Sequence, residues 1–71
     1  MTDFQQRVVV EKRELDERIQ KLEAFISNSP VFPTLPTDER FCLEAQLTLM
    51  RGLSNILGIR ILKFDQTLDE T

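Results

Sequence analysis

The few residues of this 71-residue chain that could do chemistry are suited to binding more than to catalysis. The chain has no histidine and one cysteine, Cys42, so it cannot form an internal disulfide or assemble a zinc-type site from its own residues. Without a histidine, Ser54 has no base to activate it as a nucleophile. No Gly-rich phosphate loop or catalytic triad is present. The sequence therefore predicts no enzyme, no metal site and no cofactor.

Two residues near the N-terminus could hold a nucleotide. Phe4 and Arg7 lie one helical turn apart if this stretch is helical. An aromatic ring offers a surface on which an unpaired base can stack, and the planar guanidinium of arginine suits a phosphate. The alternative for Phe4 is simple packing against Phe64 at the end of the molecule.

Glu11 is a charged residue near the centre of the apolar stripe expected on the first helix. A carboxylate there must be paired, or the stripe must open to water or to a ligand at that point. An antiparallel hairpin would bring Glu11 close to Arg60. One interpretation is an ion pair that fixes the register of the helices. The other is a polar pocket between subunits, in which Arg7, Arg60 and Gln46 are hydrogen-bond donors.

Two helices must position these side chains. Apolar residues recur at helical spacing over residues 4–27 and again over residues 37–64. Residues 28–36 contain three prolines, which forbid a continuous helix, and residues 65–71 form a polar tail expected to be frayed. We therefore predict one all-α domain over residues 1–71, an antiparallel two-helix hairpin. Phe32 and Leu35 should cap the end of its core.

The second helix carries more apolar surface than one partner helix can cover. Its apolar arc spans roughly 240°, whereas a core-facing stripe needs little more than about 100°. A chain this short also builds only a small core and usually needs additional stabilisation. We expect the hairpin to complete its core as a homo-oligomer. The expected interface residues are Leu43, Leu47, Leu49, Met50, Leu53, Ile56, Leu57 and Ile61.

Charge and hydropathy exclude several other partners. The net charge is −3 and charges of both signs are mixed along the chain, so binding to DNA or RNA polymers is not expected. The N-terminus lacks the apolar core of a signal peptide, and the longest uncharged stretch is too rich in proline to span a membrane. The single thiol fits a reducing compartment, so we expect a cytoplasmic protein.

The order of these residues resembles a family of small phage-encoded helical hairpins, related to the hairpin module of anti-CBASS and anti-Thoeris sponge proteins. The resemblance covers residues 4–64. The matching positions are Gln6-Arg7-Val8, Glu11, Glu14-Leu15, Lys21-Leu22, Phe25-Ile26, Phe32, Leu35, Glu39-Arg40, Leu43, Gln46-Leu47, Met50, Ile56-Leu57 and Arg60-Ile61.

The resemblance implies a function in evading host defence within the host cytoplasm. Such proteins form oligomers and hold cyclic nucleotide or cyclic ADP-ribose second messengers in pockets between subunits, without cleaving them. It implies ligand binding by Phe4, Arg7, Glu11, Gln46 and Arg60. The related pockets favour a tyrosine near the N-terminus, where this chain has a phenylalanine. The alternative is a small inhibitor or accessory protein that binds another protein through its apolar helix face.

Overall fold

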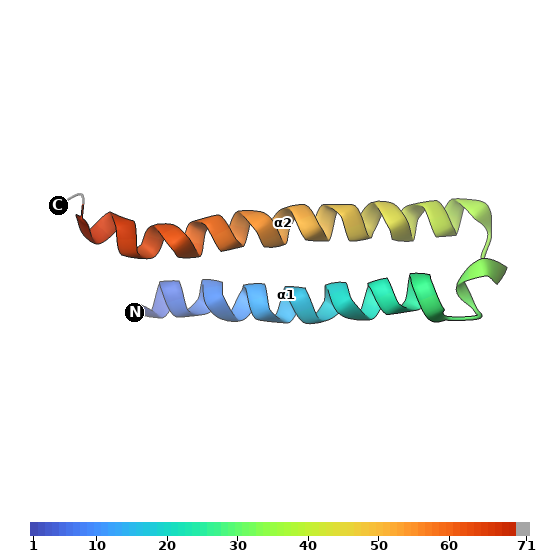
Figure 1. The fold of residues 1–71 in the computed structure, drawn as a ribbon, viewed down its shortest axis with the longest axis horizontal. Coiled ribbons are helices and arrows are strands. Elements are labelled where there is room, and N and C mark those ends of the chain that lie inside the picture. The colour runs from blue at the N-terminus through green and yellow to red at the C-terminus, as the bar shows by residue number, and fades with distance from the viewer. Residues whose placement is uncertain (70–71) are drawn as a thin grey trace.

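A computed structural model describes the backbone of residues 1–69 and the side chains of residues 1–64. Helix α1 (Asp3–Asn28) and helix α2 (Thr37–Asp69) run antiparallel, joined by a connection that contains the short 3-10 helix η1 (Phe32–Thr34) (Figure 1). The molecule is a rod with extents of 55 × 15 × 15 Å. The prediction of an all-α antiparallel hairpin is confirmed, and its completion by other copies stays a prediction.

The start of α1 is fixed by a reciprocal pair of hydrogen bonds at Thr2. The N–H of Gln5 donates to the Thr2 hydroxyl at 3.1 Å, and the N–H of Thr2 donates to the Gln5 side-chain oxygen at 3.0 Å. This capping box satisfies donors that a helix N-terminus otherwise leaves unpaired. It therefore holds in place the first turn of α1, which carries Phe4.

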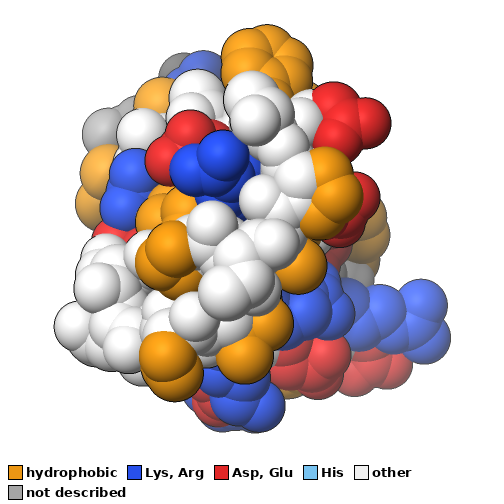
Figure 2. Space-filling view, turned by 90° about the vertical axis from the view of Figure 1, so that its right-hand side faces the viewer, with side chains coloured by type: hydrophobic (Ala, Val, Ile, Leu, Met, Phe, Trp, Pro, Cys, Tyr) orange, Lys and Arg blue, Asp and Glu red, His pale blue; other side chains and the backbone are white. Residues whose placement is uncertain are grey.

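The connection closes one end of the core. Phe32 is buried, and its ring meets Phe25 edge to face with the ring centroids 6.0 Å apart. Arg40 at the start of α2 donates from Nε to the carbonyl of Leu35 at 3.1 Å, which ties the connection to the helix. Phe32 thus caps the core as predicted. Figure 2 looks along the rod from this end and shows hydrophobic side chains among uncharged groups on the end surface.

The predicted end of the second helix at Phe64 is wrong, because α2 continues to Asp69. No glycine or proline follows Phe64, so the backbone chemistry gives no reason for the helix to stop there. The predicted fraying of the tail stays a prediction, and residues 70–71 lie outside the described part of the chain. The C-terminal end of α2 extends past the start of α1 (Figure 1).

The core is a single line of side chains between the two helices. Its most buried member is Leu57, with 1% of its surface exposed. Partly buried apolar residues from both helices extend this line toward each end. The buried members are Val8, Leu15 and Ile19 from α1 and Leu47 and Leu57 from α2.

Much apolar surface remains outside this core, most of it on α2. No helix in the described part of the chain has both the length and the apolar character of a membrane span. The large apolar side chains of α2 that are exposed are Phe41, Leu49, Leu53, Ile56, Ile59 and Leu62.

Candidate functional site

The open end of the hairpin pairs an aromatic ring with a guanidinium. Arg60 of α2 lies over the ring of Phe4 in α1, with Cζ 5.8 Å from the ring centroid. This is within the distance at which a cation is attracted to the face of an aromatic ring. Phe4 is 63% exposed and Arg60 is also exposed, so both groups are accessible from solvent.

Arg7 and Glu11 lie further along α1, on an exposed hollow that is lined by α1 residues alone. Its volume is ≈ 330 Å³, and Gln6, Val10 and Glu14 complete the lining. Arg7 is one turn from Phe4. The hollow carries two carboxylates and one guanidinium, so Arg7 is its only described cation.

The prediction that Glu11 lies at the centre of the inner stripe is wrong. Glu11 is exposed, and within residues 1–64 it forms no ion pair with Arg60. Lys12 takes the inner position between Val8 and Leu15. Both positions satisfy helical spacing, but the long apolar stem of lysine can lie along the core while its ammonium reaches a polar partner.

Gln46 is far from the other predicted binding residues within one chain. It is fourteen residues before Arg60 on the same helix, which corresponds to about 21 Å at 1.5 Å per residue. Its side-chain nitrogen contacts the sulfur of Met50 at 3.9 Å, and it lies in an apolar groove at the other half of α2. The hairpin therefore brings together Phe4 and Arg60, with Arg7 nearby, and leaves Gln46 apart.

A polar cluster that the sequence interpretation missed connects the helices near their middle. Lys12 Nζ donates to Asp16 Oδ2 at 2.8 Å and to Ser54 Oγ at 3.1 Å, and Ser54 Oγ donates to Asp16 Oδ1. Ser54 is 8% exposed. The hydrogen bond from Lys12, followed by that from Ser54, holds the pKa of Asp16 below its ordinary value.

The sequence contained a signal for this cluster. Ser54 interrupts an apolar stripe, and an antiparallel register places the middle of α1 opposite it. A buried hydroxyl needs a partner, so the polar residues facing it could have been sought. Ser54 donates a hydrogen bond to the Asp16 carboxylate of α1 and accepts one from Lys12, so the cluster connects the two helices.

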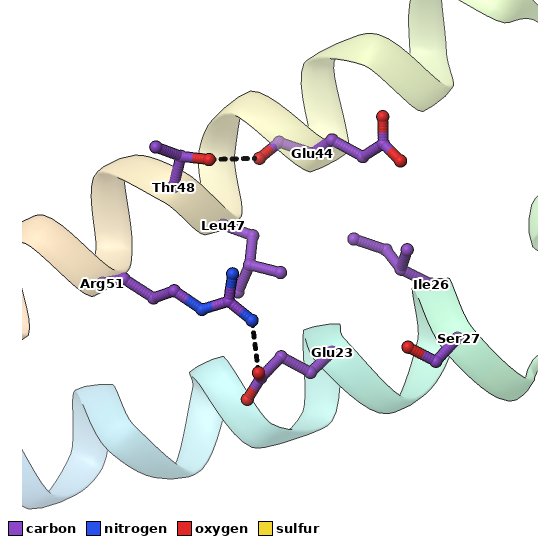
Figure 3. A pocket seen from close by; sticks show the side chains of 7 residues that line it. All are labelled: Glu23, Ile26, Ser27, Glu44, Leu47, Thr48 and Arg51. Carbon is purple, nitrogen blue, oxygen red and sulfur yellow. Dashed lines mark hydrogen bonds and ion pairs between the residues drawn. The ribbon is translucent and has the colours of Figure 1, made fainter.

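A second polar contact between the helices borders a hollow of ≈ 300 Å³, nearer the segment that joins α1 to α2. Arg51 of α2 donates to Glu23 of α1, and Figure 3 shows the two side chains meeting across the hollow. Glu44 adds another carboxylate to the lining. Because its one arginine is already bound to a carboxylate, this hollow is unsuited to a phosphate.

The predicted interface residues of α2 divide into two groups. Leu47 and Leu57 are buried against α1, with Leu43, Met50 and Ile61 half-buried beside them, so little of their surface is available to another copy. Leu49 and Ile56 are 75% and 55% exposed, and Leu53 is exposed between them. The surplus apolar surface predicted from the sequence is therefore present on the hairpin.

Leu49, Leu53 and Ile56 belong to a longer line of exposed residues along α2, which we call the second seam. Its positions recur every three or four residues and run parallel to the buried stripe. It consists of Cys42, Gln46, Leu49, Leu53, Ile56 and Arg60.

The family described as Sequestin matches residues 2–63. This range includes all of α1 and α2 as far as residue 63. It covers the Phe4–Arg60 pair, the Lys12–Asp16–Ser54 cluster and the second seam. No curated protein and no solved structure matches the chain.

Proposed function

The chain belongs to the Sequestin family, and we propose that it sequesters a cyclic nucleotide or cyclic ADP-ribose second messenger without cleaving it. The protein would act as a phage anti-defence factor in the host cytoplasm. By holding the messenger in pockets between its subunits, it would keep the messenger from a host effector. The family description itself indicates a sequestering role.

The observation that carries this proposal is the pair of Phe4 and Arg60. The exposed ring offers a stacking face for a base, which is worth about 1–3 kcal/mol for each base stacked. Arg60 lies 5.8 Å from the ring centroid and can bond a phosphate of the same ligand. Arg7, one turn along α1, adds a second guanidinium. A cyclic nucleotide presents the same combination of a flat base beside a phosphate.

Sequestration requires tight binding and no chemical step. The net charge of −3 disfavours unspecific attraction of phosphates, so selectivity must come from local arginines and from stacking. The protein would have to be as abundant as the messenger it removes, because each pocket holds one molecule and releases no product.

The test is a thermal-shift screen of the purified protein against cyclic dinucleotides, cyclic trinucleotides and cyclic ADP-ribose isomers. A compound present at about 100 times its Kd adds about 2.7 kcal/mol to the free energy of unfolding. For a domain of this size that corresponds to a rise of several degrees in Tm. A selective shift supports the proposal, and a flat panel at high compound concentration contradicts it.

Matched variants separate binding from stability. Phe4→Ala and Arg60→Ala should remove the shift while leaving the Tm of the free protein within a few degrees, because both side chains are exposed. Arg13→Ala is the control, since Arg13 is an exposed arginine of α1 outside the Phe4–Arg60 pair. If Phe4→Ala, Arg60→Ala and Arg13→Ala all change the thermal shift to the same extent, a binding site at the open end is contradicted.

A second candidate function rests on the second seam. Its exposed Leu49, Leu53 and Ile56 could bind another protein and block it. Mass in solution discriminates between the two functions. A closed homo-oligomer covers the seam by itself, whereas a monomer leaves it available to a different protein.

A further inference from the structure

The open end of the hairpin has no backbone connection, so side chains alone hold Arg60 over Phe4. The Arg60 Cζ lies 5.8 Å from the ring centroid, close to the limit of about 6 Å within which a cation is attracted to an aromatic face. Side chains extend about 5–6 Å from a helix axis, so a rotation of α2 by about 30° would move the end of Arg60 by about 3 Å. A small rotation would therefore end the contact.

Apolar packing does not by itself prevent such a rotation. The residues that bury α2 against α1 near this end are Leu57, which is 1% exposed, and the partly buried Ile61 and Phe64. Contacts of this kind are non-directional, and apolar side chains can repack to follow a small movement. A hydrogen bond depends on both distance and angle, so it restrains rotation more strongly.

The Lys12–Asp16–Ser54 cluster supplies hydrogen bonds of this kind near the open end. Ser54 is six residues before Arg60, which corresponds to about 9 Å along α2. Lys12 is eight residues after Phe4, which corresponds to about 12 Å along α1. Lys12 Nζ donates to Ser54 Oγ at 3.1 Å, and Asp16 accepts a hydrogen bond from both groups. The cluster thus joins the two helices within about two turns of the pair.

Lys12 meets α2 at a second point, one turn closer to Arg60. A Cβ at Gly58 would lie 3.3 Å from Lys12 Cε, so the lysine stem occupies the space beside this glycine. Gly58 is four residues after Ser54 and two before Arg60. Two contacts of one lysine side chain, one turn apart on α2, restrain both the position and the rotation of that helix.

We propose that Lys12 and Ser54 are positioning residues for the Phe4–Arg60 pair. Their hydrogen bond fixes the rotation of α2 against α1 and so keeps the guanidinium over the ring. Asp16 holds the ammonium and the hydroxyl in place by binding both. The effect on ligand binding rests on the proposed function, and the effect on the pair does not.

The position of Arg60 can be measured without any ligand. Protons above the face of an aromatic ring are shifted upfield in NMR spectra, so the Hδ resonances of Arg60 report how much of the time this side chain lies over Phe4. Phe4→Leu has no ring and defines zero shift, and the wild type defines the full shift. Ser54→Ala should lose at least half of it, because its hydrogen bond to Lys12 is gone.

Two further variants show whether this loss is specific. Lys12→Met keeps a long unbranched stem without the ammonium, so it should lose the shift as Ser54→Ala does. Glu23→Gln is the control, because it removes the ion pair with Arg51 that joins the helices nearer the connection. It should keep the full shift. A full shift in both Ser54→Ala and Lys12→Met, or an equal loss in Glu23→Gln, would overturn the proposal.

The same variants give a quantitative link to binding. If the ligand needs Arg60 over Phe4, the apparent Kd rises by the reciprocal of the fraction of molecules that keep this geometry. A variant that retains about one third of the upfield shift should therefore bind about threefold more weakly. Isothermal titration calorimetry with 3′,3′-cyclic di-AMP and with cyclic ADP-ribose measures the Kd, and Glu23→Gln should bind as the wild type does.

Positioning and binding can fail separately. If the wild type binds neither probe and no compound of the thermal-shift panel, the proposed function fails, and the Arg60 resonances still decide the positioning. If Ser54→Ala loses the upfield shift while its Kd for a bound probe does not change, the ligand does not use the pair, and the ligand part of the inference is overturned.

Discussion

Ser54 shows how a single hydroxyl can set the register of two helices. Its hydrogen bonds with Lys12 and Asp16 join α1 and α2 in the middle of an otherwise apolar interface between the two helices. A shift of either helix by one residue would separate these groups and leave polar atoms inside that interface, which is costly. The apolar residues alone would tolerate such a shift more easily. The cluster therefore gives the packing its specificity.

Replacing Ser54 by alanine removes its hydrogen bonds to Lys12 and Asp16 and should lower the stability of the protein. We expect Ser54→Ala to lower the free energy of unfolding by about 1 kcal/mol relative to Asn55→Ala. Asn55 is the exposed neighbour of Ser54, so its replacement gives a similar gain in helix propensity without touching the cluster. Urea denaturation measures both. Equal stability of the two variants would mean that the cluster contributes nothing.

Asp16 should make the stability of the protein depend on acid pH. Its pKa is held below the ordinary value of 3.8 by Lys12 and then by Ser54. The folded state therefore binds fewer protons than the unfolded state, so this contribution is fully present above about pH 4 and is lost as the pH falls through the folded pKa. Tm measured between pH 2.5 and pH 7 should show wild type losing its advantage over Asp16→Asn at the acid end. A difference that does not change with pH would contradict this assignment.

The inner position of α1 is taken by Lys12 and not by the predicted Glu11, which shows what residue spacing can and cannot predict. Both positions are three or four residues from Val8 and Leu15, so the period of the helix allows either to face inward. The choice depends on side-chain reach and on the partner opposite, Ser54. The sequence predicts Arg60 close to Glu11, whereas the structure places Arg60 over the ring of Phe4. The geometry of that contact required the actual crossing of the two helices.

At the level of the helices, Gly58 has a packing role that Gly52 lacks. A Cβ at Gly58 would lie 3.3 Å from Cε of Lys12, whereas a Cβ at Gly52 would meet nothing within 4 Å. The absence of a side chain at Gly58 therefore leaves room for the lysine stem on its way to Ser54. Gly52 merely lowers the helix propensity of an exposed position.

The two glycines should respond differently to alanine. Gly52→Ala should raise the free energy of unfolding by about 0.5–1 kcal/mol through helix propensity alone. Gly58→Ala should gain clearly less or lose stability, because Lys12 must move by a few tenths of an ångström. Urea denaturation of both variants gives the comparison. An equal gain at the two positions would show that Lys12 adapts without cost.

The helices themselves were predictable because local signals agreed. The three prolines separated two periodic segments, and the apolar intervals in each were those of a helix. The sequence predicts an end of the second helix at Phe64 because the tail after it is polar and acidic. Backbone chemistry permits five more residues, and α2 continues to Asp69.

At the level of the whole molecule, the hairpin buries little apolar surface and leaves much of it exposed. Among residues 1–64, whose side chains the structure describes, the core of this two-helix rod is one line of contacts formed by five buried apolar residues. Small cores of this kind usually need additional stabilisation. The sequence predicted the surplus apolar surface of α2. It could not tell which of two neighbouring stripes faces α1, because adjacent positions share the same period.

Association of copies should make the Tm depend on protein concentration. Each tenfold increase adds about 1.4 kcal/mol to the free energy of association, which corresponds to a rise of a few degrees in Tm for a domain of this size. Differential scanning calorimetry over two decades of concentration measures this effect. Leu53→Glu should show a constant Tm. A wild-type Tm that does not change with concentration would contradict an oligomer.

The position of the Phe4–Arg60 pair has a consequence for dynamics. The connection closes one end of the hairpin, whereas the other end is held only by side chains, so local opening costs least there. A molecule bound between Phe4 and Arg60 would join the two helices at that end. Its binding energy would then appear as slower amide hydrogen exchange in the first turns of α1 and around Arg60, while residues near Phe32 exchange as before. Capture of the messenger would, in effect, close the second end of the rod.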